Sequence, residues 1–165
     1  MQDLRFAGRW ALEFYNKLGM KYAEKDLGNA ITNEGLNKIL NVMFHGSTAA
    51  PQLTTWYIGF IDNASYSALA AADTMASHAG WIECTAYTGN RKEWTEGAAS
   101  SQAMTNAATV DFAINATKTL KGIFLCSVAT GTSGTLWATG AFASTQAVNS
   151  GDTVKITYTL TAANG

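Results

Sequence analysis

The chain has 165 residues, of which 47% are hydrophobic and only 14% are charged. This composition excludes an intrinsically disordered chain, because disordered chains are rich in charge and poor in aromatic side chains. The formal net charge of −1 offers no basic surface for nucleic acid. No run approaches the ~20 apolar residues of a membrane-spanning helix, and the first residues do not resemble a secretory signal. We therefore expect one globular domain with neither nucleic acid nor a membrane as partner.

An N-terminal β-hairpin is predicted over residues 10–27. Trp10, Leu12 and Phe14 alternate with smaller or polar residues, and residues 16–19 read NKLG. Such a tetrapeptide is typical of a turn that ends in a glycine at positive φ. A helix is the competing interpretation, because apolar residues also recur every four positions here. The turn favours the hairpin.

A short amphipathic helix is predicted over residues 33–45. Asn33 can cap it, and Glu34 suits the first turn because of the helix dipole. Gly46 follows as a natural helix stop. The apolar residues form one stripe with helical spacing, the pattern of a helix that packs on a core by one face. They are Leu36, Ile39, Leu40, Met43 and Phe44.

The rest of the chain is predicted to be strands joined by turns of Gly, Asn and Thr. The clearest strand is 153–161, whose Val154, Ile156, Tyr158 and Leu160 we expect to point inward. Residues 65–78 fit either a short helix or a loop folded over the sheet. The other expected strands are 54–61, 81–87, 109–115, 120–128, 135–139 and 145–148. This pattern predicts a mainly β fold, an antiparallel β-sandwich or jelly roll with one short N-terminal amphipathic helix and an N-terminal β-hairpin.

Charge and aromatic content suggest that part of the surface is covered by another subunit. Only five charged residues lie in 97–165, whereas sheet edges are usually protected by charge. Aromatic residues in excess of a core often anchor protein interfaces. We divide the chain into a hairpin arm, 1–28, and a sandwich domain, 29–165, and expect the arm to contribute most of an interface. The candidate interface residues are Phe6, Trp10, Tyr15, Tyr22, Arg91, Lys92 and Trp94.

The sequence shows no arrangement typical of catalysis or metal binding. Its two histidines, His45 and His78, do not combine with Cys84 into the short ligand spacings of a zinc site. Glu93 and Glu96 flank a tryptophan, which fits either a glycosidase-like pair or a solvated turn. We therefore predict no enzymatic activity, no cofactor and no metal.

Two cysteines, Cys84 and Cys126, are far apart in the sequence. Without a secretory signal, reduced thiols are the expected state, because disulfides form mainly in oxidising compartments. We predict that both cysteines are free and buried.

Segments spread over nearly the whole chain resemble small structural proteins of tailed bacteriophages. They are 29–37 (NAITNEGLN), 44–47 (FHGS), 55–60 (TWYIGF), 73–81 (DTMASHAGW), 112–117 (FAINAT), 134–138 (GTLWA) and 150–159 (SGDTVKITYT). The resemblance implies a virion component that assembles in the host cytoplasm. A capsid decoration (cement) protein on the head surface is the first choice. It would bind the major capsid protein or another virion protein and form a homo-oligomer, dimer or trimer. The alternative is a tail, collar or head-fibre component that binds a carbohydrate or receptor.

Overall fold

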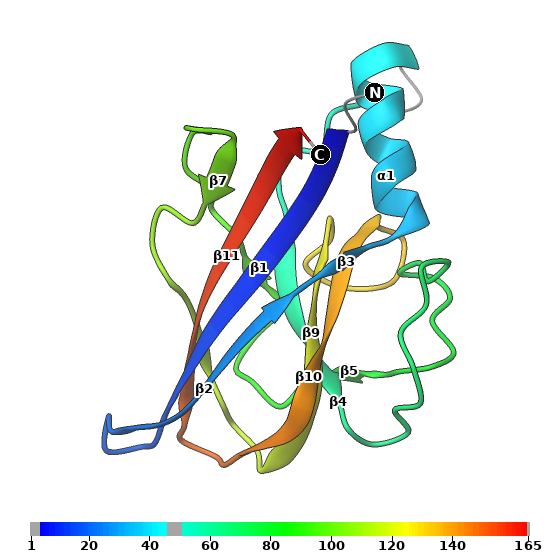
Figure 1. Cartoon of the computed structure of the whole chain (residues 1–165). Coiled ribbons are helices and arrows are strands. Elements are labelled where there is room, and N and C mark those ends of the chain that lie inside the picture. Colours follow the sequence, from blue (N-terminus) through cyan, green and yellow to red (C-terminus); the bar gives the residue numbers. More distant parts are fainter. Residues whose placement is uncertain (1–3, 46–50, 165) are drawn as a thin grey trace.

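Two antiparallel β-sheets pack face to face in the computed structural model, which describes residues 4–45 and 51–164 (Figure 1). The first sheet has the order β2 (Lys21–Gly28), β1 (Leu4–Tyr15), β11 (Thr153–Asn164) and β7 (Ala103–Thr105), and β8 (Val110–Ala113) also pairs with β11. The second has the order β3 (Ala30–Ile31), β10 (Leu136–Val148), β9 (Lys118–Cys126), β4 (Tyr57–Asp62) and β5 (Glu83–Cys84), and β6 (Lys92–Glu93) also pairs with β4. The predicted mainly β sandwich is confirmed.

The predicted N-terminal hairpin is present, but it belongs to the sandwich. Gly19 closes the turn at φ +76°, and β1 pairs with β11 along its whole length, from Leu4 opposite Asn164 to Tyr15 opposite Thr153. Because side chains alternate across a strand, Trp10, Leu12 and Phe14 share one face, which is fully buried. Residues 4–28 thus supply two strands of the first sheet and do not form a separate arm.

The inward face of β11 is as predicted. Val154, Ile156 and Tyr158 are buried, and Leu160 is half-buried towards one end of the sandwich. Tyr158 lies at the centre of the core, with its ring centroid 4.0 Å from that of Trp10. Its hydroxyl accepts hydrogen bonds from Asn29 Nδ2 (2.7 Å) and Trp137 Nε1 (3.2 Å), which link the two sheets.

One long strand, β10, replaces the two short strands predicted at 135–139 and 145–148. Between Ala141 and Gln146 it leaves its pairing with β9. The backbone stays extended there, and Lys25 Nζ of β2 donates to Ser144 Oγ at 2.9 Å. Phe142 in this stretch is buried, whereas residues 143–145 are exposed.

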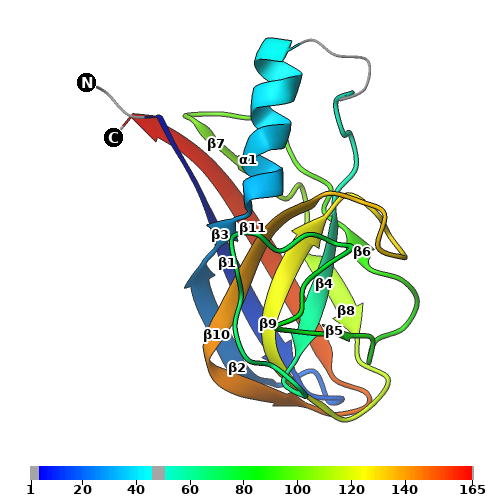
Figure 2. The same ribbon diagram turned by 90° about the vertical axis from the view of Figure 1, so that its right-hand side faces the viewer.

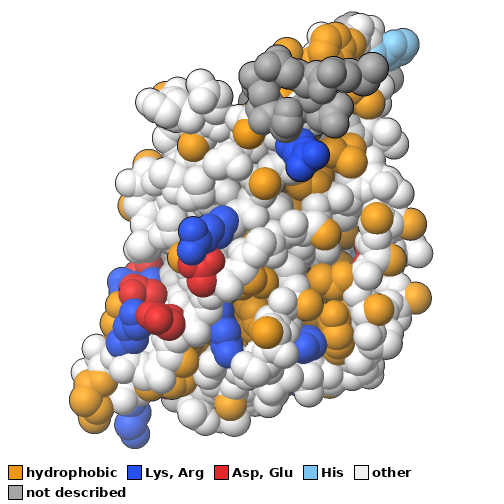
Figure 3. Space-filling model, in the orientation of Figure 1, with side chains coloured by type: hydrophobic (Ala, Val, Ile, Leu, Met, Phe, Trp, Pro, Cys, Tyr) orange, Lys and Arg blue, Asp and Glu red, His pale blue; other side chains and the backbone are white. Residues whose placement is uncertain are grey.

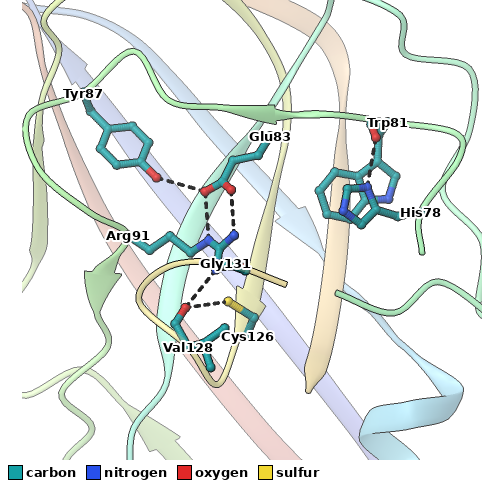
Figure 4. Close-up of polar contacts among 8 residues, drawn as sticks. All are labelled: His78, Trp81, Glu83, Tyr87, Arg91, Cys126, Val128 and Gly131. Carbon is teal, nitrogen blue, oxygen red and sulfur yellow. Dashed lines mark hydrogen bonds and ion pairs between the residues drawn. The ribbon is translucent and has the colours of Figure 1, made fainter. Parts of the chain in front are cut away.

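A loop over residues 63–82 covers the outer face of the second sheet, which confirms the loop interpretation of residues 65–78. Met75 and Trp81 are buried against Phe124. Trp81 Nε1 donates to Asp73 Oδ2 at 3.0 Å, and the His78 ring stacks on the Trp81 ring at 3.8 Å (Figure 4). These contacts give the loop a small core of its own.

The helix α1 (Asn33–Leu40) continues into one π-helical turn, η1 (Asn41–His45). Its N-cap is Thr32 and not Asn33, because the Thr32 hydroxyl accepts the Gly35 N–H at 3.1 Å. A Cβ at position 35 would lie 2.6 Å from the Trp137 carbonyl oxygen, so glycine permits the close contact with β10. No helix in residues 4–45 or 51–164 is long and apolar enough to cross a membrane.

The apolar stripe predicted on this helix does not pack on the core as a whole. Of its five members only Ile39 packs against the core. The helix is attached to the sandwich by its first turn and then projects beyond the ends of the sheets (Figure 2). Its later turns therefore have no sheet to cover them.

Candidate protein interface

The predicted interface residues Trp10 and Trp94 lie inside the sandwich. Trp10 is 0% and Trp94 is 3% exposed. Trp94 Nε1 donates to Asn106 Oδ1 at 2.8 Å, and the same oxygen accepts the Tyr158 N–H at 2.8 Å. Both tryptophans are therefore core residues, which corrects their assignment to a surface.

Arg91 is also internal, since it holds two loops together (Figure 4). Its Nε and Nη2 donate to the two carboxylate oxygens of Glu83 at 2.8 and 2.7 Å. Its Nη1 donates to the carbonyls of Val128 and Gly131, both at 3.0 Å, and its guanidinium lies over the Phe124 ring. With its side chain 5% exposed, Arg91 is a structural clamp and is not available to a partner.

The remaining predicted residues do not gather on one surface. Tyr15 and Tyr22 lie beside the hairpin turn, and their hydroxyls donate to Glu13 Oε2 (2.8 Å) and Asp152 Oδ2 (2.7 Å). Phe6 is half-buried near the other end of β1, and Lys92 donates to the Thr88 carbonyl at 2.8 Å. These four residues do not form a common interface.

An exposed apolar surface does exist on the projecting helix. We define the helix ridge as Leu36, Leu40, Met43 and Phe44, which are 41%, 56%, 68% and 80% exposed. These fractions amount to roughly 500 Å² of apolar side chain, a patch size that is often functional on a soluble protein. Some hydrophobic side chains are visible around the helix at the top of Figure 3. This ridge is the candidate interface.

The first turn of the helix that carries the ridge is anchored to the sandwich. The Thr32 hydroxyl donates to the Leu136 carbonyl, and the Leu136 N–H donates to Glu34 Oε2 at 2.8 Å. With the tight Gly35 contact, these bonds tie the first turn of α1 to the start of β10. The ridge is thus presented in one orientation, which reduces the ordering cost of binding.

A second feature lies beside the helix, where the two sheets open. We define the tryptophan hollow as the space of about 230 Å³ at this end of the sandwich. Trp56 and Trp137 form one wall and meet edge to face at 5.8 Å. The other main lining residues are Leu53, Trp94, Met104 and Leu160, and Gln52 and Glu96 provide the polar atoms. A shallower groove of about 220 Å³ continues from it along the helix, past Ile39 and Val42.

The two carboxylates considered for chemistry, Glu93 and Glu96, border different depressions. Glu96 lines the tryptophan hollow, and Glu93 lies beside β8. Within residues 4–45 and 51–164, no group of three His, Cys, Asp or Glu side chains could hold a metal ion.

Cys84 and Cys126 are free and buried, as predicted. Burial raises the pKa of both thiols, so the reactive thiolate is scarce at neutral pH. We expect iodoacetamide at pH 8 to leave the native protein unmodified and to alkylate both cysteines in guanidinium chloride, as measured by intact mass. An adduct on the native protein would show that one thiol is accessible.

Residues 30–162 match the family of Podophage GP4 fiber I protein gp80. The chain belongs to this family. No curated protein matches the chain. The protein is therefore a structural component of a phage virion, and the expected relationship to tailed-phage virion proteins is confirmed at that level. The family is named after a fibre protein and not after a capsid decoration protein.

Sequence reasoning found the members of the ridge but not their role. The spacing of Leu36, Leu40 and Met43 correctly places them on one helix face. The spacing does not show where the sandwich lies relative to that face. Val42 lies next to Ile39 and widens the apolar stripe on the flank that lines the groove beside Trp56 and Trp137.

Proposed function

We propose that this chain is a fibre subunit of the phage particle and that it acts without catalysis, through protein–protein contacts of its helix ridge. The observation that carries the proposal is the ridge itself, four large apolar side chains held in water on an anchored helix. Membership of a family named after a fibre protein supports it. Leaving such a patch exposed favours aggregation, so a partner that covers it is the physical reason for its presence.

A capsid decoration protein is the second candidate. These 165 residues show no internal repeat of the kind that builds a long shaft, and the strands of residues 4–31 and 57–164 form one sandwich. A compact domain with one apolar projection also suits attachment to a shell. In that case the same ridge would contact the major capsid protein.

Carbohydrate binding is less well supported. Sugar rings stack on flat aromatic faces, whereas Trp56 and Trp137 meet at an interplanar angle of 62°. The indole N–H groups of Trp94 and Trp137 already donate within the core. The hollow therefore offers a sugar few polar partners.

The proposal is tested by the double variant Leu40→Gln/Met43→Gln, because glutamine keeps the helix propensity and removes the apolar surface. The matched control is Leu18→Gln/Met20→Gln at the hairpin turn, where the same residue types are 73% and 56% exposed. Light scattering should show the parent and the control in multi-copy assemblies and the ridge variant as a monomer.

Uptake of the protein by phage particles provides the second measurement. Phage particles that lack the protein should take up the parent and the control, and the ridge variant should be taken up poorly. Uptake by empty heads alone would favour the decoration role, and uptake that requires the fibre attachment sites would favour the fibre role. A ridge variant that assembles and is taken up like the parent would overturn the proposal.

A further inference from the structure

We infer that the helix ridge of one copy of this chain fills the tryptophan hollow of a second copy, and that the ridge of the second copy fills the hollow of the first. This inference rests on the proposed function, since it names the partner of the same ridge. The two surfaces lie at the same end of the molecule and are linked by the groove along Ile39 and Val42.

Residues of both sheets line the hollow. Leu160 and Met104 reach it from the first sheet, and Trp137 and Leu125 reach it from the second. Buried apolar surface is stabilising, so an apolar occupant would complete the core at this end. The hollow measures about 230 Å³, and a cavity of roughly 150 Å³ already holds benzene. One phenyl ring with part of a neighbouring side chain therefore fits.

The ridge offers such an occupant. Phe44 is 80% exposed on the last described turn of the helix, and Met43 beside it is 68% exposed. A methionine adapts its shape to irregular gaps, whereas phenylalanine adds the largest apolar area. Together they form a projection that matches an aromatic hollow in chemistry and size.

Ridge-to-ridge packing is the competing arrangement. Leu36, Leu40 and Met43 have the four-three spacing of a coiled-coil seam. However, α1 and η1 together span only residues 33–45, fewer than two heptads, while coiled coils extend over three or four. That packing would also leave the hollow open. Insertion of the ridge into the hollow covers both apolar surfaces at once.

Charge is compatible with the same arrangement. The ridge contains no charged residue, and Lys38 on the same helix lines the groove beside the hollow. The polar rim of the hollow carries Glu96. The uncharged ridge therefore brings no like charge to Glu96.

The interface area is sufficient only if each copy makes two contacts. Covering roughly 500 Å² of ridge with an equal area of partner buries about 1,000 Å² per contact, near the lower limit for a specific interface. Because ridge and hollow lie at the same end of the molecule, the two contacts can form between the same two copies about a two-fold axis, which brings the buried area to about 2,000 Å². We therefore expect a two-fold dimer.

The test uses two full-length variants that each remove one half of the contact. The ridge variant is Phe44→Gln with Met43→Gln. The hollow variant is Leu53→Arg, which puts a charge at the hollow in a half-buried position on a connecting segment. Leu18→Arg at the hairpin turn is the control. Circular dichroism and melting temperature confirm that each variant is folded.

Each variant alone should be monomeric by light scattering, with a dissociation constant raised about 100-fold, as for the loss of a hot-spot residue. Mixed in equal amounts, they should form a dimer with one copy of each, because the ridge of the hollow variant can enter the hollow of the ridge variant. Native mass spectrometry identifies that heterodimer.

Three outcomes would overturn the inference. The hollow variant could assemble like the parent, the mixture could remain monomeric, or the parent could itself be monomeric at high concentration. In the last case, loss of particle uptake by the ridge variant would leave the proposed function standing, with another virion protein as the partner. If the ridge variant were taken up like the parent, that result would contradict both this inference and the proposed function.

Discussion

A chain that lacks residues 1–28 is expected not to fold. The deletion removes β1, which pairs with β11 along its whole length, and β2 beside it. It also removes Trp10, Leu12 and Phe14 from the centre of the core. Loss of one large core side chain typically costs about 2–5 kcal/mol, so three of them match or exceed the ordinary stability of a domain, about 5–15 kcal/mol. Circular dichroism and amide NMR dispersion would show the loss of structure.

A matched pair of point variants distinguishes the loss of core packing from the shortening of the chain as the cause of unfolding. Leu12 is 1% exposed and Leu18 is 73% exposed, although both belong to the same hairpin. We expect Leu12→Ala to lower the free energy of unfolding by about 2–5 kcal/mol, and Leu18→Ala to change it by less than about 0.5 kcal/mol. Urea denaturation measures both. If the truncated chain melted cooperatively and Leu12→Ala were neutral, residues 1–28 would be an accessory arm after all.

The second large effect is expected for Arg91→Met. The substitution leaves the Glu83 carboxylate without its partner and frees the carbonyls of Val128 and Gly131. Breaking a buried ion pair by removing one partner costs about 3–5 kcal/mol. The Glu83 side chain is 22% exposed, so solvent offsets part of that cost. We therefore expect a loss of about 2–4 kcal/mol in the free energy of unfolding.

Arg9→Met is the matched control for this clamp. Arg9 also forms two hydrogen bonds with one carboxylate, that of Asp26, but the two side chains are 72% and 51% exposed. Exposed ion pairs contribute about 0–1 kcal/mol, so the control should unfold nearly like the parent. Equal effects of the two substitutions in urea denaturation would show that burial does not distinguish the pairs. Loss of particle uptake by Arg91→Met at full stability would instead restore Arg91 as an interface residue.

Local patterns predicted the elements of this fold well where a strand or turn is determined by its own residues. The alternation in 153–161 correctly identified Val154, Ile156 and Tyr158 as inward-facing, and the NKLG turn correctly predicted the hairpin. Predictions that depended on neighbours were less accurate. The strand β10 continues through a stretch where its pairing with β9 is interrupted, and the helix is capped by Thr32, whose hydroxyl also bonds to the Leu136 carbonyl.

At the candidate site, too, local patterns were predicted correctly and features that depend on neighbouring elements were not. Aromatic residues were expected at an interface because the chain has many of them, yet Trp10 and Trp94 are covered by the opposite sheet. The sequence alone determined the β class, the inward faces of the strands, the buried free cysteines and the membership of one helix stripe, because each follows from periodicity or composition. Only the tertiary structure decided that the stripe faces water, because periodicity shows which side chains share a face but not what lies against it. The position of α1 at the end of β10 leaves its later turns beyond the sheets, and that placement makes the helix ridge available to a partner.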